Sequence, residues 1–278
     1  MWYLQVDTSI KNAIFPGVKY PLVLGHEIIG EIVDLGSDIK NIKKNDIVGL
    51  GIPAGYMFDG GFSQYMLAKE SDLVLIPKGL NLIESAPLLC AGVTTFSALK
   101  NCGAKSGDLV GVCGIGGLGH LAIQYGNKMR FNMVAISRNE DKKDLAMKLG
   151  AKYYFSIGKS DFVQDIKNLG GAKAILIAGP SENIADKLID CLKEGGKLML
   201  LGTNTKSMEF SINPIIFGKK SIQGWVDFDN EMKKECLEFS LKNRIKPMIQ
   251  TYKFEELQKG YDDMAKGKAK FRSVIKFD

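Results

Sequence analysis

Gly114-Ile115-Gly116-Gly117-Leu118-Gly119 is the stretch that decides the fold of this 278-residue chain. It follows the apolar run 109–113 and opens a segment whose apolar residues recur with helical spacing at 118, 121, 122 and 125. Glycines between a strand and a helix permit a tight turn, and the free N–H groups of the helix N-terminus can face a pyrophosphate. The pattern therefore predicts a dinucleotide-binding loop made by these six residues, although a glycine-rich turn without a ligand would have the same sequence.

Around this loop, apolar runs alternate with segments of helical length. Further strands are expected at 133–136, 153–157, 174–178 and 198–201, because these runs are short and almost continuously apolar. Such alternation predicts a parallel sheet with helices on both faces. We therefore expect an α/β architecture with a doubly wound nucleotide-binding domain over residues 91–226.

The rest of the chain has a different pattern. Residues 1–90 contain short alternating segments, such as 27–33 and 73–76, separated by turns and by a glycine-rich connector at 49–61. The tail, residues 227–278, contains two helical segments and a terminal strand, and it carries no phosphate loop. We expect residues 1–90 to form a small β-rich domain.

The residues after the second expected strand indicate which dinucleotide binds. An NAD site usually has an acidic side chain about 20 residues after the loop, which accepts a hydrogen bond from the ribose 2′-OH. Here Ser137 and Arg138 follow the strand 133–136, and Lys142 lies one turn later. Because a guanidinium binds a phosphate through two parallel hydrogen bonds, these residues predict NADP(H) rather than NAD(H). In the alternative, Arg138 is a solvated residue of the first helical turn.

Composition excludes several classes of protein. Lys and Arg number 37 against 31 Asp and Glu, a net charge of +6, but the signs are interleaved, so we expect no nucleic-acid partner. No run reaches the roughly 18 apolar residues of a membrane span, and the N-terminus lacks the pattern of a leader peptide, so we expect no membrane partner. The five cysteines form no CxxC pair, which favours a reducing cytoplasm over a secreted disulfide framework.

Two positions in the first part of the chain are candidates for chemistry. His26 is one of only two histidines, and it lies in Gly25-His26-Glu27 just before an expected strand. Cys90 lies at the junction of the two expected domains, and clefts between domains are where substrates bind. Taken singly, His26 could be a hydrogen-bonded structural residue and Cys90 a small buried hydrophobe.

Four segments together resemble the zinc-type medium-chain alcohol dehydrogenases, most closely their cinnamyl-alcohol and yeast-like branch. The segments are Tyr20-Pro21-Leu22-Val23-Leu24-Gly25-His26-Glu27, Gly-Gly-Phe-Ser-Gln-Tyr at 60–65, residues 86–95 and the glycine loop. They occur in the family's order, and the resemblance covers nearly the whole chain. It implies a GroES-like catalytic domain over 1–90 that is incomplete and is completed by 227–278, together with a Rossmann domain over 91–226.

The resemblance also implies the site residues. In that family a catalytic zinc is held by a Cys, the His of the Gly-His-Glu motif and a second Cys, and it polarises the substrate oxygen as hydride passes to or from the nicotinamide. His26 and Cys90 correspond to the second and third ligands. Glu27 corresponds to a residue that lies beside the metal and approaches it in some members. Thr94 matches a residue that packs on the nicotinamide.

The chain departs from the family in three places. The segment of the first zinc ligand reads Tyr3-Leu4-Gln5-Val6-Asp7, which places Leu4 at the ligand position and Val6 at the proton-relay hydroxyl. Glu27 is the first candidate to complete the zinc site and Asp7 the second. The connector 49–61 replaces the four-cysteine loop, so no structural zinc is expected. Before His26 the chain is shorter than family members, as expected for a truncated member or for one whose exposed strand edge another protomer covers.

Three functions follow from these observations. The first is an NADP(H)-dependent alcohol dehydrogenase or aldehyde reductase that acts on a small-molecule alcohol or aldehyde with a zinc-polarised oxygen. The second is a zinc-free quinone or enoyl reductase of the same superfamily, which the missing Cys favours and the retained His26 and Cys90 oppose. The third is a catalytically inactive NADP(H)-binding protein, because Leu4 and Val6 are apolar. Family members are usually homodimers or homotetramers joined through the edge of the Rossmann sheet, which the expected strand 221–225 could supply.

Overall fold

The chain divides into two compact units in the computed structural model. The first unit comprises residues 1–93 and 227–278, and the second comprises residues 94–226. The structure describes residues 7, 10–11, 17–159, 161–202 and 207–277. Leu4 and Val6, which the sequence places at the first ligand and relay positions, lie outside these residues.

The second unit is built on a six-stranded parallel sheet with the strand order β6-β5-β4-β7-β8-β9. Its strands are β4 (Leu109–Cys113), β5 (Asn132–Ser137), β6 (Tyr153–Ser156), β7 (Ala172–Ile177), β8 (Leu192–Leu200) and β9 (Ser221–Gly224). The chain runs outward from β4 to β6, returns to β7 and runs outward again to β9. The predicted doubly wound parallel sheet is therefore confirmed.

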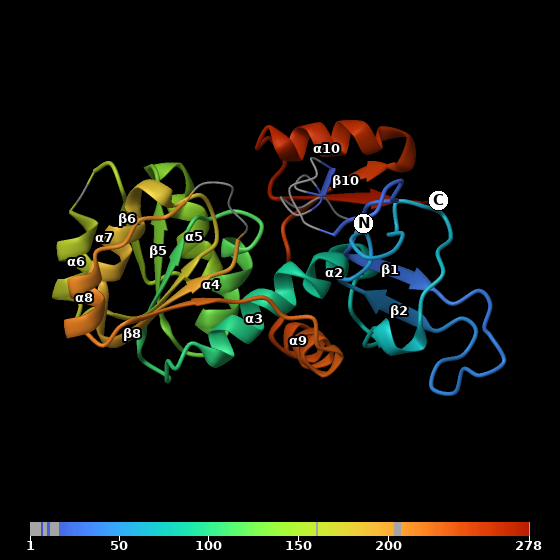
Figure 1. Ribbon diagram of the computed structural model, residues 1–278, viewed down its shortest axis with the longest axis horizontal. Helices are drawn as coiled ribbons and strands as arrows, with labels where there is room; N and C mark the ends of the chain where they lie inside the picture. Colours follow the sequence, from blue (N-terminus) through green and yellow to red (C-terminus); the bar gives the residue numbers. More distant parts are fainter. Residues whose placement is uncertain (1–6, 8–9, 12–16, 160, 203–206, 278) are drawn as a thin grey trace. The chain divides into compact units, whose positions relative to one another are not determined.

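Helices cover both faces of this sheet (Figure 1). They are α3 (Ala91–Asn101), which begins in the first unit, α4 (Gly119–Lys128), α5 (Lys143–Leu149), α6 (Phe162–Asn168), α7 (Ala185–Asp190) and α8 (Ile212–Phe217), with 3-10 turns at η3 (Glu140–Lys142) and η4 (Glu182–Ile184). On one face α4 packs with α5, and on the other α7 packs with α6 and α8. Of the apolar stripe predicted at 118, 121, 122 and 125, Leu121, Ala122 and Tyr125 are fully buried in α4, whereas Leu118 just before the helix is half-buried. Helix α5 ends at Gly150, whose φ of 108° lets it act as a left-handed C-cap.

Strand β8 differs from its predicted position. It begins at Leu192, six residues before the expected start at 198, because Leu192 pairs with Ala172 of β7; regular pairing then resumes at Lys197 opposite Ala174. The register shifts between Ala172 and Ala174 of the neighbouring β7. A search for apolar runs misses the first part of this strand, because residues 193–196, which follow Leu192, are polar or glycine.

The first unit contains two small sheets. Strands β1 (Ile28–Glu31), β2 (Ile47–Leu50) and β3 (Val74–Leu75) are antiparallel, and β10 (Ile249–Lys253) pairs in parallel with β11 (Arg272–Lys276). The helices are α2 (Leu82–Ser85), α9 (Asn230–Asn243) and α10 (Leu257–Ala265), with 3-10 turns η1 (Glu70–Asp72), η2 (Ala86–Leu89) and η5 (Phe254–Glu256). Ile28 and Leu50 share a core with Tyr252 and Ile275 of the tail. The tail is therefore packed into the same unit as the N-terminal strands.

Within the described residues, no single helix is long and apolar enough to cross a membrane. One bent pair, Leu82–Leu89 with Ala91–Asn101, meets the length and composition only when both parts are taken together across a 53° bend.

The doubly wound sheet has a switch point between β4 and β7, where the chain direction across the sheet reverses. Ligands of such sheets bind in the crevice at the carboxyl ends of the strands beside this point. Gly114 follows β4 there, and a Cβ on it would lie 2.9 Å from the backbone nitrogen of Gly179 after β7. The glycine loop predicted from the sequence thus lies at the switch point.

Candidate functional site

His26 is buried just before β1, with one ring nitrogen held and the other unpartnered. Its Nδ1 lies 3.1 Å from Oδ1 of Asp7, which also accepts a hydrogen bond of 3.3 Å from the N–H of Gly25. The His26 Nε2 atom is buried and has no hydrogen-bond partner in the part of the chain that the structure describes. Metal-ligating histidines usually have this arrangement, in which a carboxylate fixes one nitrogen and the other binds the metal.

Two further residues with possible ligand atoms lie beside the imidazole of His26. Ligand atoms of His26, Glu27 and Cys90 all lie within 4.8 Å of one another, and all three residues are buried. Cys90 ends the η2 turn, and Glu27 follows His26 into β1. The structure therefore brings together the three residues that the sequence predicts as catalytic and metal-binding.

The charges around His26 oppose the effect of burial on its pKa. Burial alone would lower the pKa of His26, but the nearby Asp7 and Cys90 raise that pKa well above its ordinary value. Asp7 and Cys90 therefore favour a positive charge at the imidazole, whether that of a proton or of a metal ion. Asp7, the second candidate for a zinc ligand, instead lies on the Nδ1 side of His26 and orients the ring.

Glu27 already has protein partners for its carboxylate. Nη2 of Arg272 donates to its two oxygens at 2.7 and 2.9 Å, and the N–H of Ala91 donates to Oε1 at 3.0 Å. Burial raises the pKa of Glu27, and the charges of Arg272 and His26 partly oppose this. Burial also lowers the pKa of Arg272 to about 10 despite the Glu27 carboxylate. The pair is a fully buried ion pair next to the donor cluster.

Sequence reasoning missed Arg272, and it also missed a second buried cation, Lys233. Lys233 lies on α9, is 2% exposed and donates from Nζ to Oδ1 of Asn230 at 2.9 Å. Burial lowers the pKa of Lys233, while the charges of Cys90 and Asp72 oppose this shift. For Arg272 a signal existed, since an arginine begins the expected terminal strand 272–277, in which Val274, Ile275 and Phe277 are apolar. Lys233 lies in a polar helix, and its sequence context gives no such signal.

The donor set fits zinc. Imidazole nitrogen, thiolate sulfur and carboxylate oxygen are the three zinc-ligand types, and catalytic zinc sites use three protein ligands with a fourth position for water or substrate. The unpartnered, buried Nε2 of His26 is the observation that a metal would explain most directly, because a buried polar atom without a partner is costly.

The glycine loop in the second unit has the geometry of a pyrophosphate site. Gly114 adopts a φ of 93°, and a Cβ on Gly119 would lie 1.9 Å from the carbonyl oxygen of Gly114. A Cβ on Gly116, by contrast, would meet nothing within 4 Å. The backbone N–H groups of Gly116, Gly117 and Leu118 donate to no acceptor among the described residues. The loop therefore presents free donors and open space at the N-terminus of α4, which fits a bound pyrophosphate.

The residues predicted to bind at the ribose 2′-position lie at the end of β5 and in the turn that follows it. Ser137 ends β5 and is 8% exposed, and Arg138 follows it as an exposed residue. Lys142 ends the η3 turn, and its Nζ donates to the carbonyl oxygen of Ile115 at 2.7 Å. Burial, then the charge of Arg138, lower the pKa of Lys142. Thr94 in α3 is buried, and its Oγ1 has no hydrogen-bond partner in the described structure.

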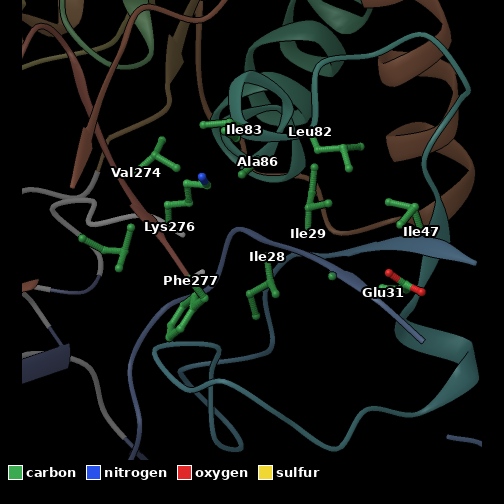
Figure 2. Close-up of a pocket in the computed structure, with 12 residues that line it drawn as sticks. Ile28, Ile29, Glu31, Ile47, Leu82, Ile83, Ala86, Val274, Lys276 and Phe277 are labelled. Carbon is green, nitrogen blue, oxygen red and sulfur yellow. The ribbon is translucent and has the colours of Figure 1, made fainter. Parts of the chain in front are cut away.

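A pocket of about 310 Å³ in the first unit is separate from these residues (Figure 2). Ile28, Ile29 and Ile47 line it from β1 and β2, Ile83 from α2, and Phe277 from near the end of the chain. Its charged lining residues are Glu31 and Lys276. None of the residues predicted as catalytic, metal-binding or cofactor-binding lines it.

Two family models match this chain, one in its N-terminal part and one mainly in the second unit. A model of the alcohol dehydrogenase GroES-like domain matches residues 4–78, and a model of the zinc-binding dehydrogenase family matches residues 117–242. The GroES-like plus Rossmann fold class predicted from the sequence is therefore confirmed.

Individual relatives support the same family. An alcohol dehydrogenase of Geobacillus stearothermophilus is 32% identical over 93% of this chain and 83% of its own length. A probable cinnamyl alcohol dehydrogenase of Populus deltoides is 30% identical over 92% of this chain and 80% of its own length. The crystal structure of CAD from Helicobacter pylori, complexed with NADP(H), is 26% identical, has a TM-score of 0.86 and covers 99% of this chain and 87% of its own. The chain belongs to the zinc-type medium-chain alcohol dehydrogenase family and is an oxidoreductase.

Proposed function

We propose that this protein is an NADP(H)-dependent alcohol dehydrogenase or aldehyde reductase with one catalytic zinc held by His26, Cys90 and Glu27. The observation that carries the proposal is the convergence of these three buried donors, with the Nε2 of His26 left unpartnered. Zinc bound there would act as a Lewis acid on the oxygen of an aldehyde or alcohol while hydride passes from or to the nicotinamide. The names of the relatives support a small-molecule alcohol or aldehyde as substrate.

The protein's own residues prepare this centre. Asp7 holds Nδ1 of His26, so that the ring can rotate little and Nε2 keeps its direction. Arg272 compensates the charge of Glu27, and the Ala91 N–H fixes one of its oxygens. Of the three proposed ligands, Glu27 therefore has the strongest competing interactions. We propose that it completes the site in place of the cysteine that Leu4 replaces.

Cofactor binding divides between two groups of residues. The loop from Gly114 to Gly119 would bind the pyrophosphate through its free N–H groups and the dipole of α4. Ser137 and Arg138 would bind the 2′-phosphate, and a relative whose structure was solved with NADP(H) supports this choice. Thr94 would pack against the nicotinamide, as the resemblance to the family implies. Its buried, unpartnered hydroxyl supports a polar group of the cofactor there.

The wider assignments are also proposals. The two domains predicted from the sequence would serve as a catalytic domain, 1–90 with 227–278, and an NADP(H)-binding domain, 91–226. All five cysteines are free thiols, which supports a cytoplasmic location.

Strand β9 forms one edge of the parallel sheet, and Ile212, Ile216 and Phe217 of the adjoining α8 segment are 67%, 59% and 82% exposed. An edge strand beside exposed apolar side chains supports a homodimer, or a homotetramer built from it, joined at this edge.

One observation favours a second candidate, a zinc-free quinone or enoyl reductase. Both oxygens of Glu27 already accept hydrogen bonds from Arg272, so a protein without zinc has no unpaired carboxylate at this position. In that case His26 and Cys90 would be structural, and an activated double bond would be reduced by NADPH without a Lewis acid.

Turnover of NADPH with a panel of aldehydes and enones separates the two candidates. For the zinc enzyme we expect aldehyde reduction that exhaustive chelation abolishes and added zinc restores, with Cys90→Ser at background in the same assay. Cys236→Ser is the matched control, because Cys236 is an equally buried thiol on α9 outside the donor cluster. Enone reduction that survives chelation, with Cys90→Ser still active, would replace the proposal by the zinc-free reductase.

A further inference from the structure

Two side chains hold neighbouring carbonyl groups of the glycine loop. Nζ of Lys142 donates to the carbonyl oxygen of Ile115 at 2.7 Å. Nδ1 of His120 lies 2.8 Å from the carbonyl oxygen of Gly116, which also accepts the backbone N–H of His120 at 3.1 Å. Because a carbonyl only accepts, Nδ1 of His120 carries the hydrogen. His120 is fully buried in the first turn of α4, and Lys142 reaches the loop from the turn after β5.

These contacts fix the direction of the loop's N–H groups. In a planar trans peptide the C=O and the next N–H point in opposite directions. A bond to the Ile115 carbonyl therefore sets the direction of the Gly116 N–H, and a bond to the Gly116 carbonyl sets that of the Gly117 N–H. Both N–H groups lack an acceptor among the described residues, so they remain available to a ligand on the opposite side. Without such contacts Gly116 and Gly117 would sample many backbone conformations.

We propose that Lys142 and His120 are positioning residues that pre-orient the N–H groups of the glycine loop for the pyrophosphate. The inference rests on the proposed binding of a dinucleotide at this loop. It assigns Lys142 a different part in cofactor binding from that of Arg138. Since NADPH and NADH share the pyrophosphate, Lys142 and His120 support both cofactors equally, whereas Arg138 supports only the cofactor with a 2′-phosphate.

Burial of Lys142 agrees with this role. Its ammonium is half-buried against the loop, and burial lowers its pKa, with the neighbouring charge of Arg138 adding to the effect. A hydrogen bond from a charged donor to the Ile115 carbonyl is stronger than one between neutral groups, so it can hold this peptide of the loop in one orientation.

Titrations of the full-length protein with NADPH, NADH and 2′-AMP test the assignment, because 2′-AMP carries the 2′-phosphate but no pyrophosphate. For Lys142→Met we expect Kd for NADPH and for NADH to rise together by about tenfold, the loss expected of a hydrogen bond to a charged donor. Binding of 2′-AMP should stay at the wild-type value. His120→Phe should raise both dinucleotide Kd values in the same way, and Arg138→Met should raise those of NADPH and 2′-AMP only.

Lys143→Met is the matched control. It removes the same charge at the next position in the sequence, where the lysine side chain is exposed and pairs with Glu140. A Lys142→Met protein that loses NADPH and 2′-AMP but keeps NADH would make Lys142 a 2′-phosphate ligand and overturn the inference. Unchanged binding of all three ligands would overturn it too. If His120→Phe does not fold, Lys142→Met and Lys142→Gln decide alone. A wild-type protein that binds neither dinucleotide would overturn the proposed function and this inference with it, whereas failure of the variants alone leaves the proposed function standing.

Discussion

Two buried side chains of the donor cluster are held by partners that come from distant parts of the chain. His26 is oriented by Asp7, and Glu27 is paired with Arg272, which lies 245 residues further along. Each partner acts on one neighbour: Asp7 sets the ring direction, and Arg272 compensates a buried negative charge. The chemistry of the site therefore depends on residues that would not themselves bind the metal.

Removal of Asp7 should weaken metal binding without removing a ligand. In Asp7→Ala the imidazole of His26 loses the acceptor for Nδ1, and we expect zinc affinity to fall by about 10- to 100-fold, as is typical for partners of metal-bound histidines. Competition with a chromophoric chelator measures this affinity. Asp7→Asn, which keeps an acceptor oxygen, should fall between wild type and Asp7→Ala; equal affinities in all three proteins would exclude an orienting role.

Loss of Arg272 should destabilise the fold. Arg272→Met leaves the Glu27 carboxylate buried without its counter-charge, so we expect the free energy of unfolding to fall by about 3–5 kcal/mol in urea titrations at pH 7. The double variant Glu27→Gln with Arg272→Met should recover much of this loss. Additive losses in the double variant would show that the two side chains are not coupled.

The stability of the single variant Arg272→Met should also depend on pH in a defined direction. Burial raises the pKa of Glu27, and Arg272 opposes that shift, so its removal raises the folded-state pKa further above the unfolded value. A group of this kind stabilises the fold below its unfolded pKa, and the contribution is lost as pH rises through the folded pKa. The stability deficit of Arg272→Met relative to wild type should therefore shrink as the pH is lowered from 7 towards 5.

At the scale of elements, the glycine loop and its flanking β4 and α4 form the most predictable part of the molecule. Gly114 and Gly119 are required by close approach to other backbone atoms, whereas Gly116 faces open space. Gly114 and Gly119 are thus needed for the fold, whereas Gly116 leaves space for the proposed ligand. This division separates variants that damage the structure from variants that block the cofactor.

Gly116→Ala and Gly119→Ala form a matched pair for this division. In Gly119→Ala the new methyl group would lie 1.9 Å from the Gly114 carbonyl oxygen. We expect a loss of about 1–3 kcal/mol of stability, as for other overpacked sites, together with loss of cofactor binding. Gly116→Ala should unfold like wild type yet bind NADPH more weakly, because its methyl group projects into the space proposed for the pyrophosphate. Equal stability losses in both variants would contradict this assignment.

Sequence patterns could predict those features that depend on neighbouring residues. The loop, the strand at 109–113 and the C-cap at Gly150 follow from local spacing and backbone preference, and the structure contains them. His26, Glu27 and Cys90 were recognisable because they lie in segments that resemble a known family. The pairing of Glu27 with Arg272, the burial of Lys233 and the contact of Lys142 with Ile115 depend on tertiary packing, which periodicity does not encode.

At the scale of the whole molecule, the second unit presents an unpaired sheet edge beside exposed apolar residues. Strand β9 pairs only with β8 among the described strands, and Phe217 of α8 is 82% exposed. Burial of an aromatic side chain of this size stabilises an interface by about 1.5–3 kcal/mol. The proposed homodimer would bury Phe217 and extend the sheet.

A charge at this position should therefore dissociate the assembly. We expect Phe217→Lys to elute as a monomer in size-exclusion chromatography with light scattering, under conditions in which wild type is a dimer or tetramer. Leu67→Lys is the control, because Leu67 is 93% exposed and belongs to the first unit rather than to the unit that contains β9. An oligomer that persists in Phe217→Lys and dissociates in Leu67→Lys would place the interface elsewhere.

The most direct test of the account is the zinc-to-protein ratio of the dialysed wild-type protein, measured by elemental mass spectrometry beside Cys90→Ser and His26→Gln. The account predicts about one zinc per chain in wild type, as a single three-ligand site requires, and far less in both variants. A wild-type protein that carries no zinc while it still binds NADPH, or variants that keep the full complement, would contradict the proposed catalytic centre.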